Sequence, residues 1–161
     1  MYTPLGVKTD YSLLQSLIKI EDYLSYAKKN GYTCLGILDD SLCSAHAFYE
    51  ACKKANMKCV IGLDIIIEET KMYLYPKNWQ GLTNLFKLTK KGLEVDLKIE
   101  DLKAFKEEII CVLPYESYSL YDKLDPLFQD CFLSFLNKEE EIEAKMKSKH
   151  TLYLHPIYAL N

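Results

Sequence analysis

The sequence contains no arginine, because all 20 of its basic residues are lysine. Arginine is the side chain best suited to bidentate contacts with phosphate groups or with guanine. The net charge is -3, so the surface as a whole lacks the positive charge that attracts nucleic-acid backbones. We therefore expect that this chain does not bind nucleic acid directly.

Three further absences narrow the class of protein. The six glycines are not spaced as a phosphate-binding loop or a dinucleotide fingerprint, and no apolar run approaches the ~20 residues of a membrane span. There is no signal peptide and no cysteine pair separated by two residues. The six cysteines, several of them in apolar runs, are predicted to be reduced thiols of a cytoplasmic protein with no membrane contact. They are Cys34, Cys43, Cys52, Cys59, Cys111 and Cys131.

What is present indicates an α/β protein. The 161 residues, 49% of them hydrophobic, suit one domain or a large piece of one, so we treat residues 1–161 as a single domain. Apolar strands alternate with amphipathic helices, which favours a mostly parallel sheet or barrel covered by helices. The predicted strands are 4–9, 34–38, 58–67, 72–76, 109–114 and 151–160, and the predicted helices are one ending at Asn30-Gly31, then 43–56, 78–91, 99–108 and 138–149.

In such folds, the catalytic side chains collect where strands end and helices begin, because several loops converge there. We therefore expect functional side chains at four places. They are Lys8-Thr9-Asp10, Asp39-Asp40, Asp64 and the end of the strand 109–114.

Four segments occur in an order that resembles a known family. They are VKTDYSLLQS (7–16), IKIEDYLSYAKKNGYTCLGILDD (18–40), AFYEACKKANMKCVIGLDI (47–65) and NWQGLTNLFKLT (78–89). Together they resemble the polymerase and histidinol phosphatase (PHP) domain at the N-terminus of the bacterial DNA polymerase III alpha subunit. The resemblance is specific over about the first 90 residues. It implies a distorted seven-stranded β/α barrel, of which this chain resembles about the first two thirds, with no polymerase catalytic domain.

The resemblance also locates the family's metal-binding motifs. The histidine pair at the end of the first strand falls on Gly6 and Lys8, and the Thr-Asp-His motif ends here in Asp39 and Asp40. The family's Gly-x-Glu motif ends in Asp64, a shorter acid. None of the three histidines of the chain matches a ligand position. We therefore expect a degenerate metal site with no bound cofactor and no catalytic residue.

Lys8 introduces a positive charge where the family places a metal ligand, and an ammonium group has no lone pair to donate. One hypothesis is that Lys8 replaces the metal and neutralises Asp39, Asp40 or Asp64. In the alternative, Lys8 points to solvent and the acids are hydrated. A third alternative keeps a magnesium, manganese or zinc ion on the three carboxylates.

Two functions follow from the resemblance. The first is an inactive structural and interaction domain of a replicative polymerase, which would contact the remainder of the alpha subunit and proofreading or clamp proteins of the replisome. DNA binding and nucleotidyl transfer would then belong to the full-length protein. The second is a metal-dependent phosphoesterase or 3′–5′ exonuclease of the same superfamily. An unrelated α/β domain is the remaining alternative.

Overall fold

The computed structural model describes residues 3–160 and consists of two compact units. Residues 3–63 and 155–160 form unit 1, and residues 64–154 form unit 2. The elements in chain order are α1 (Ile20–Lys29), β1 (Cys34–Asp39), α2 (Ala45–Lys54), β2 (Lys58–Ile67), β3 (Thr70–Pro76), α3 (Trp79–Glu94), the 3₁₀ helix η1 (Ile99–Ala104), β4 (Ile109–Leu113), the 3₁₀ helix η2 (Tyr115–Leu120), α4 (Tyr121–Leu124), β5 (Asp130–Phe135), α5 (Lys138–Lys147) and β6 (Thr151–Tyr153).

Unit 1 is built on a parallel pair of strands. β1 pairs with β2 from Cys34 opposite Lys58 to Asp39 opposite Leu63. Residues 4–9, which the sequence predicts as a strand, run extended beside β1 but form only isolated parallel bridges, from Val7 to Ile37 and to Ile157. The segment is still held on both sides by backbone hydrogen bonds of 2.7–2.8 Å.

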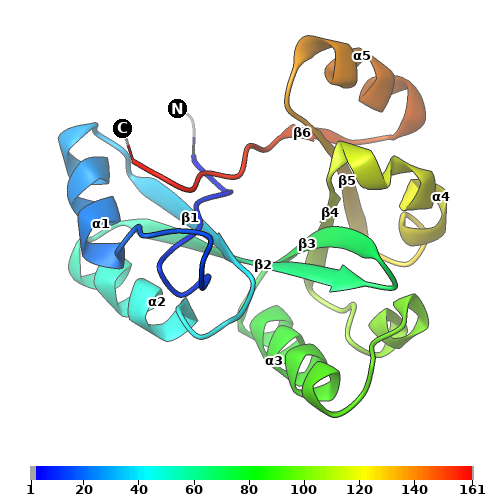
Figure 1. The fold of residues 1–161 in the computed structure, drawn as a ribbon, viewed down its shortest axis with the longest axis horizontal. Coiled ribbons are helices and arrows are strands. Elements are labelled where there is room, and N and C mark those ends of the chain that lie inside the picture. The colour runs from blue at the N-terminus through cyan, green and yellow to red at the C-terminus, as the bar shows by residue number, and fades with distance from the viewer. Residues whose placement is uncertain (1–2, 161) are drawn as a thin grey trace. The chain divides into compact units, whose positions relative to one another are not determined.

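The core of unit 1 forms where α1 and α2 lie side by side against β1 (Figure 1). Tyr23 of α1 stacks on Phe48 of α2 with ring centroids 6.3 Å apart, and Ala27 is fully buried between them and the strand residues. The apolar positions of α1 recur every three or four residues, which places them on this one face. The helix ends at Asn30, and Gly31 follows at φ +72°, as predicted from the Asn-Gly pair.

Unit 2 contains the last four residues of β2 (64–67) and the strands β3 to β6. β4 pairs antiparallel with β3, and β5 and β6 add parallel to it, while α3 packs on β3. Strand order follows chain order from β1 to β6, which is the topology of β/α barrels, whereas doubly wound sheets reverse. The predicted α/β fold class is therefore confirmed, with six strands among residues 3–160.

Two predicted elements are shorter in the structure. The predicted helix 99–108 is only the 3₁₀ helix η1, whose buried residues Ile99 and Leu102 have the three-residue spacing of that helix type. The predicted strand 151–160 is only β6 at its start, and past Pro156 the chain forms an isolated bridge from Ile157 to Val7. The segment 115–137, which has no clear pattern in the sequence, forms η2, α4 and β5.

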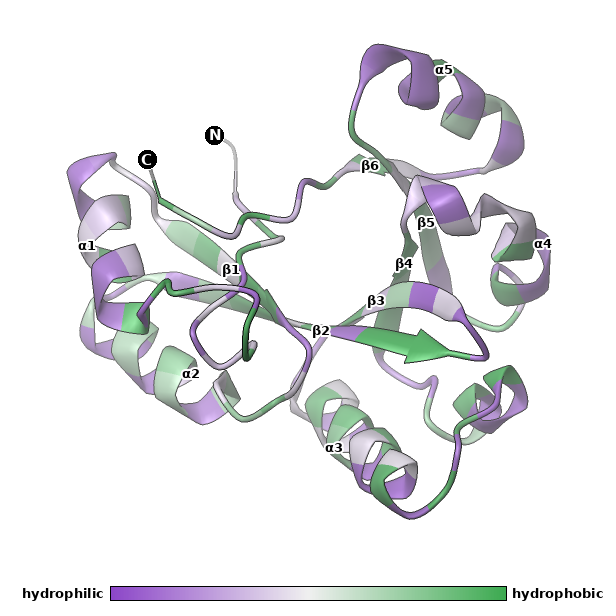
Figure 2. Ribbon diagram, in the orientation of Figure 1, coloured by the Kyte–Doolittle hydropathy of each residue, from purple (hydrophilic) through white to green (hydrophobic). Residues whose placement is uncertain are grey.

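Hydropathy follows this arrangement. Apolar residues gather on the strands, whereas α5 is mostly hydrophilic and buries only Ala144 (Figure 2). All six cysteines are free thiols, and Cys52, Cys111 and Cys131 are buried as small apolar side chains. Within residues 3–160, no helix combines the length and the hydropathy that crossing a membrane requires.

Two leucines of α3 test the packing of this helix. Leu85 is 0% exposed and Leu93 is 89% exposed. Leu85→Ala should lower the free energy of unfolding by about 2–5 kcal/mol, because it leaves a cavity in the core. Leu93→Ala makes the same chemical change at the surface and should cost less than about 0.5 kcal/mol. Urea denaturation followed by circular dichroism measures both, and equal costs would contradict the packing described.

Candidate functional site

The end of β1 carries a fully buried carboxylate, Asp39. Its Oδ1 atom accepts hydrogen bonds from the backbone N–H of Thr9 and the hydroxyl of Ser12, both at 2.7 Å. Its Oδ2 atom accepts from the hydroxyls of Thr9, at 2.7 Å, and Ser44, at 2.6 Å. A carboxylate offers about four acceptor positions. The four donors therefore use the whole acceptor capacity of Asp39.

The four hydrogen bonds come from two other segments of unit 1. Thr9 and Ser12 belong to the loop of residues 9–17, and Ser44 directly precedes α2. Thr9 lies at a predicted strand end, but no motif in the sequence predicts that Thr9, Ser12 and Ser44 donate to Asp39. The sequence does hold a clue to these donors. A buried aspartate at the end of an apolar strand needs hydrogen-bond partners, and the two loops next to this strand end contain serine and threonine.

Lys8 is buried as well, with only 1% of the residue exposed. Its N–H donates to the carbonyl oxygen of Ile157 at 2.8 Å, and its own carbonyl accepts from the hydroxyl of Ser16 at 2.7 Å. The alternative in which Lys8 points to solvent is therefore wrong. Throughout residues 3–160, no buried side-chain nitrogen or oxygen lacks a hydrogen-bond partner. Which carboxylate neutralises Lys8 stays a prediction.

Gly6 lies against the backbone of the C-terminal segment of unit 1. A Cβ atom at this position would lie 2.5 Å from the carbonyl oxygen of His155 and 3.0 Å from its carbonyl carbon. The first distance is shorter than real Cβ atoms show, the second is tighter than most, and the obstacle is backbone that cannot rotate away. Any side chain at position 6 therefore requires a shift of one of the two segments.

The remaining two predicted positions have different surroundings. Asp40 is exposed and accepts a hydrogen bond of 3.0 Å from the side-chain amide of Gln15. Asp64 belongs to unit 2, where the Nζ atom of Lys71 lies 3.6 Å from its Oδ2 atom. The structure thus places Gly6, Lys8 and Asp39 in the interior of unit 1 and Asp40 at its surface.

The histidines of the chain lie at the surface. His46, His150 and His155 are all exposed, and the ring of His150 contacts Phe132 with centroids 5.6 Å apart. In the part of the chain that the structure describes, histidine, cysteine and acidic side chains form no group of three or more that could hold a metal ion.

Asp39 and its neighbour Asp40 form a matched pair for mutagenesis. Asp39→Asn replaces one acceptor oxygen by an NH₂ group that faces hydroxyl and amide donors. Each hydrogen bond to a charged group contributes about 1.5–3 kcal/mol, so the variant should lose about 3 kcal/mol or more of unfolding free energy. Asp40→Asn makes the same change at the exposed position and should cost less than about 0.5 kcal/mol. Chemical denaturation measures the two values, and an unchanged stability of Asp39→Asn would contradict the described network.

Comparisons with known proteins identify the family of this chain. The profile of the PHP domain matches residues 4–153. The DNA polymerase III subunit alpha of Streptococcus pyogenes serotype M3 is 32% identical over 124 residues, which cover 74% of this chain and 12% of that protein. The same subunit of Halalkalibacterium halodurans is 28% identical over 122 residues, or 69% of this chain and 11% of that protein. The chain thus spans only about an eighth or less of these relatives, and it belongs to the PHP domain family.

Proposed function

We propose that this chain is the N-terminal PHP-like domain of a DNA polymerase III alpha subunit and that it has a structural and interaction role without catalysis of its own. It corresponds to about the first two thirds of the domain and acts in the cytoplasm as part of bacterial DNA replication. The family match over residues 4–153 and the relatives named above support the assignment to the alpha subunit. Support for the absence of catalysis comes from Asp39.

A metal ion binds a carboxylate through oxygen lone pairs. The four hydrogen bonds to Asp39 already use these positions, so a metal would have to displace at least one short bond of 2.6–2.7 Å. In a buried site, the displaced hydroxyl or amide would lose its partner, which costs free energy. This is the observation that carries the proposal, because Asp39 is the one acid that retains its identity in the motifs matched to the family's ligands.

The positions matched to the histidine pair favour the same conclusion. The backbone of His155 occupies the space that a side chain at position 6 would need. At position 8, the buried ammonium of Lys8 supplies a positive charge and no lone pair. We infer that Lys8 acts as an internal cation in place of a metal ion. The residues present therefore do not fit a metal centre of the family's type, and no reaction step is assigned to one.

In this proposal, nucleotidyl transfer and DNA binding belong to other parts of the full-length polymerase. The domain would contact the remainder of the alpha subunit, and proofreading or clamp proteins of the replisome are its further partners. The enzyme alternative, a metal-dependent phosphoesterase or 3′–5′ exonuclease, requires at least a metal ion held by Asp39, Asp40 or Asp64.

Metal analysis separates the two functions. The purified chain is equilibrated with zinc and manganese, desalted and measured by mass spectrometry, and the same sample is assayed on single-stranded DNA and on a phosphomonoester. We expect metal well below one ion per chain and no hydrolysis above that of the Asp39→Ala variant. Stoichiometric metal together with hydrolysis that Asp39→Ala abolishes would establish the enzyme alternative.

Lys8 provides an independent test of the internal cation. Lys8→Met keeps most of the volume of the side chain and removes its charge, so the buried partner of Lys8 loses its counter-charge. The free energy of unfolding should fall by about 2–4 kcal/mol. Lys19→Met, at an exposed lysine, is the control and should change it by less than about 0.5 kcal/mol. A similarly small effect of Lys8→Met in urea denaturation would contradict the role of Lys8 as an internal cation.

A further inference from the structure

The loop of residues 9–17 buries Thr9, Ser12 and Ser16 and exposes its leucines. Ser12 donates a hydrogen bond to Asp39, and the hydroxyl of Ser16 lies 2.7 Å from the carbonyl oxygen of Lys8 and 3.2 Å from that of Tyr158. The three leucines of the loop stand in solvent instead. Their exposed fractions are 79% for Leu13, 107% for Leu14 and 91% for Leu17.

The backbone holds Leu14 in this exposed position at a cost. Its φ is +63°, in the left-handed region that side chains with a Cβ atom rarely adopt. A leucine that is both strained and fully exposed contributes nothing to the stability of the isolated chain. Such combinations are typical of sites where strain and exposure serve binding.

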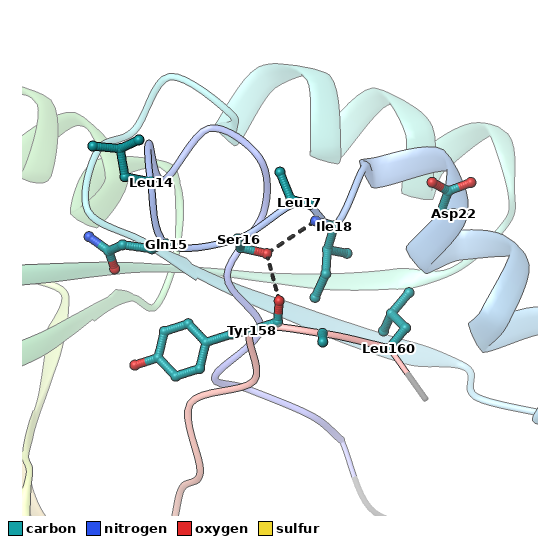
Figure 3. Close-up of a pocket in the computed structure, with 9 residues that line it drawn as sticks. Leu14, Gln15, Ser16, Leu17, Ile18, Asp22, Tyr158 and Leu160 are labelled. Atoms are coloured by element: carbon teal, nitrogen blue, oxygen red, sulfur yellow. Dashed lines mark hydrogen bonds between the residues drawn. The ribbon is translucent and has the colours of Figure 1, made fainter.

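Leu14 and Leu17 border an open pocket of about 720 Å³ on unit 1. The pocket is lined by Leu14, Gln15, Ser16, Leu17, Ile18, Asp22, Tyr158, Ala159 and Leu160. Leu14 and Gln15 lie at one end of it and Asp22 and Leu160 at the other, with Leu17 and Ile18 between them (Figure 3). The volume is in the range of sites that hold several side chains of a ligand.

The pocket has one charged lining residue, Asp22 in the first turn of α1. Asp22 is exposed, and within residues 3–160 its carboxylate has no hydrogen bond and no ion pair. Asp22 therefore gives this end of the pocket one negative charge. A cationic group placed here would gain an ion pair, and the surrounding apolar surface would exclude water from it and strengthen it.

We propose that this groove binds an apolar segment of a partner protein that carries a lysine or arginine opposite Asp22. The occupant is a polypeptide, because one small molecule in the pocket would leave the outward side chain of Leu13 in water, whereas a peptide can cover the pocket and the leucines beside it. The proposal deepens the interaction role proposed above and rests on it, since it states the chemistry of the partner.

Selection from a library of displayed random 12-residue peptides provides the probe. The full chain is immobilised, and the enriched peptides are synthesised and measured by fluorescence anisotropy. We expect enriched sequences with two or more apolar residues and one basic residue. Leu17→Ser should weaken their binding at least tenfold, whereas Leu93→Ser, which changes an exposed leucine of unit 2, should leave it unchanged.

A charge exchange tests the position of the basic residue. Asp22→Lys should weaken binding of the basic peptide at least tenfold and should restore binding to a peptide in which glutamate replaces its basic residue. Lys19→Ala, on the neighbouring surface, is the control. Failure to enrich any binding sequence, binding that tolerates Leu17→Ser, or affinity indifferent to Asp22→Lys would each overturn the proposal.

Self-association has a separate outcome. If sedimentation shows a dimer that Leu17→Ser dissociates, the groove is covered by a second copy of the chain and the partner peptide is excluded. These results are distinguishable from failure of the proposed function. Bound metal with hydrolysis would refute the inactive domain while peptide binding persisted, whereas an inactive chain that binds no peptide would refute only the groove.

Discussion

The interior of unit 1 depends on one buried charge. Asp39 is the last residue of β1. Its two oxygens accept hydrogen bonds from the loop of residues 9–17 and from Ser44, which precedes α2, and so hold both segments at the end of the strand. The loop has no helix or strand of its own, so hydrogen bonds to Asp39, Lys8 and Tyr158 take the place of a backbone ladder. A neutral amide or a protonated carboxyl at position 39 would present a donor of its own and fewer acceptor positions than the four donors need, which makes the charge a structural requirement.

The outward leucines follow from the same constraint. Ser12 and Ser16 point inward as donors, and the leucines between and beside them are exposed. The hydrogen bonds of these two serines thus fix the loop in the conformation that exposes its leucines. The site related to the family's metal centre and the groove beside Asp22 are therefore two sides of one loop, and a change at Asp39 would alter both.

Much of the fold was predictable because local signals and tertiary packing agree. β2 forms over the predicted residues 58–67, where a mostly apolar run with β-branched residues favours a strand over a helix. The end of α1 at Asn-Gly was predictable because it depends on the backbone freedom of glycine alone. The segment 115–137 was not predictable, because its short 3₁₀ and α turns depend on packing against β5 rather than on a repeat in the sequence.

The site was predictable in its residue types and not in its contacts. Matching the family motifs identified Asp39 and Lys8, but the donors to Asp39 approach from positions 5 to 30 residues away, and no spacing rule connects them. The burial of Lys8 could not be predicted from the sequence either, since lysine is almost always exposed unless a partner compensates its charge.

The close approach of the His155 carbonyl to Gly6 has a consequence for which residues position 6 can accept. One substitution that placed any larger side chain there would bring its Cβ atom to 2.5 Å from the backbone oxygen of His155 and would strain unit 1. A side chain at this position therefore needs a second change that first moves the opposing segment. Glycine at position 6 and the course of residues 155–156 are thus constrained together, and neither is expected to vary without the other.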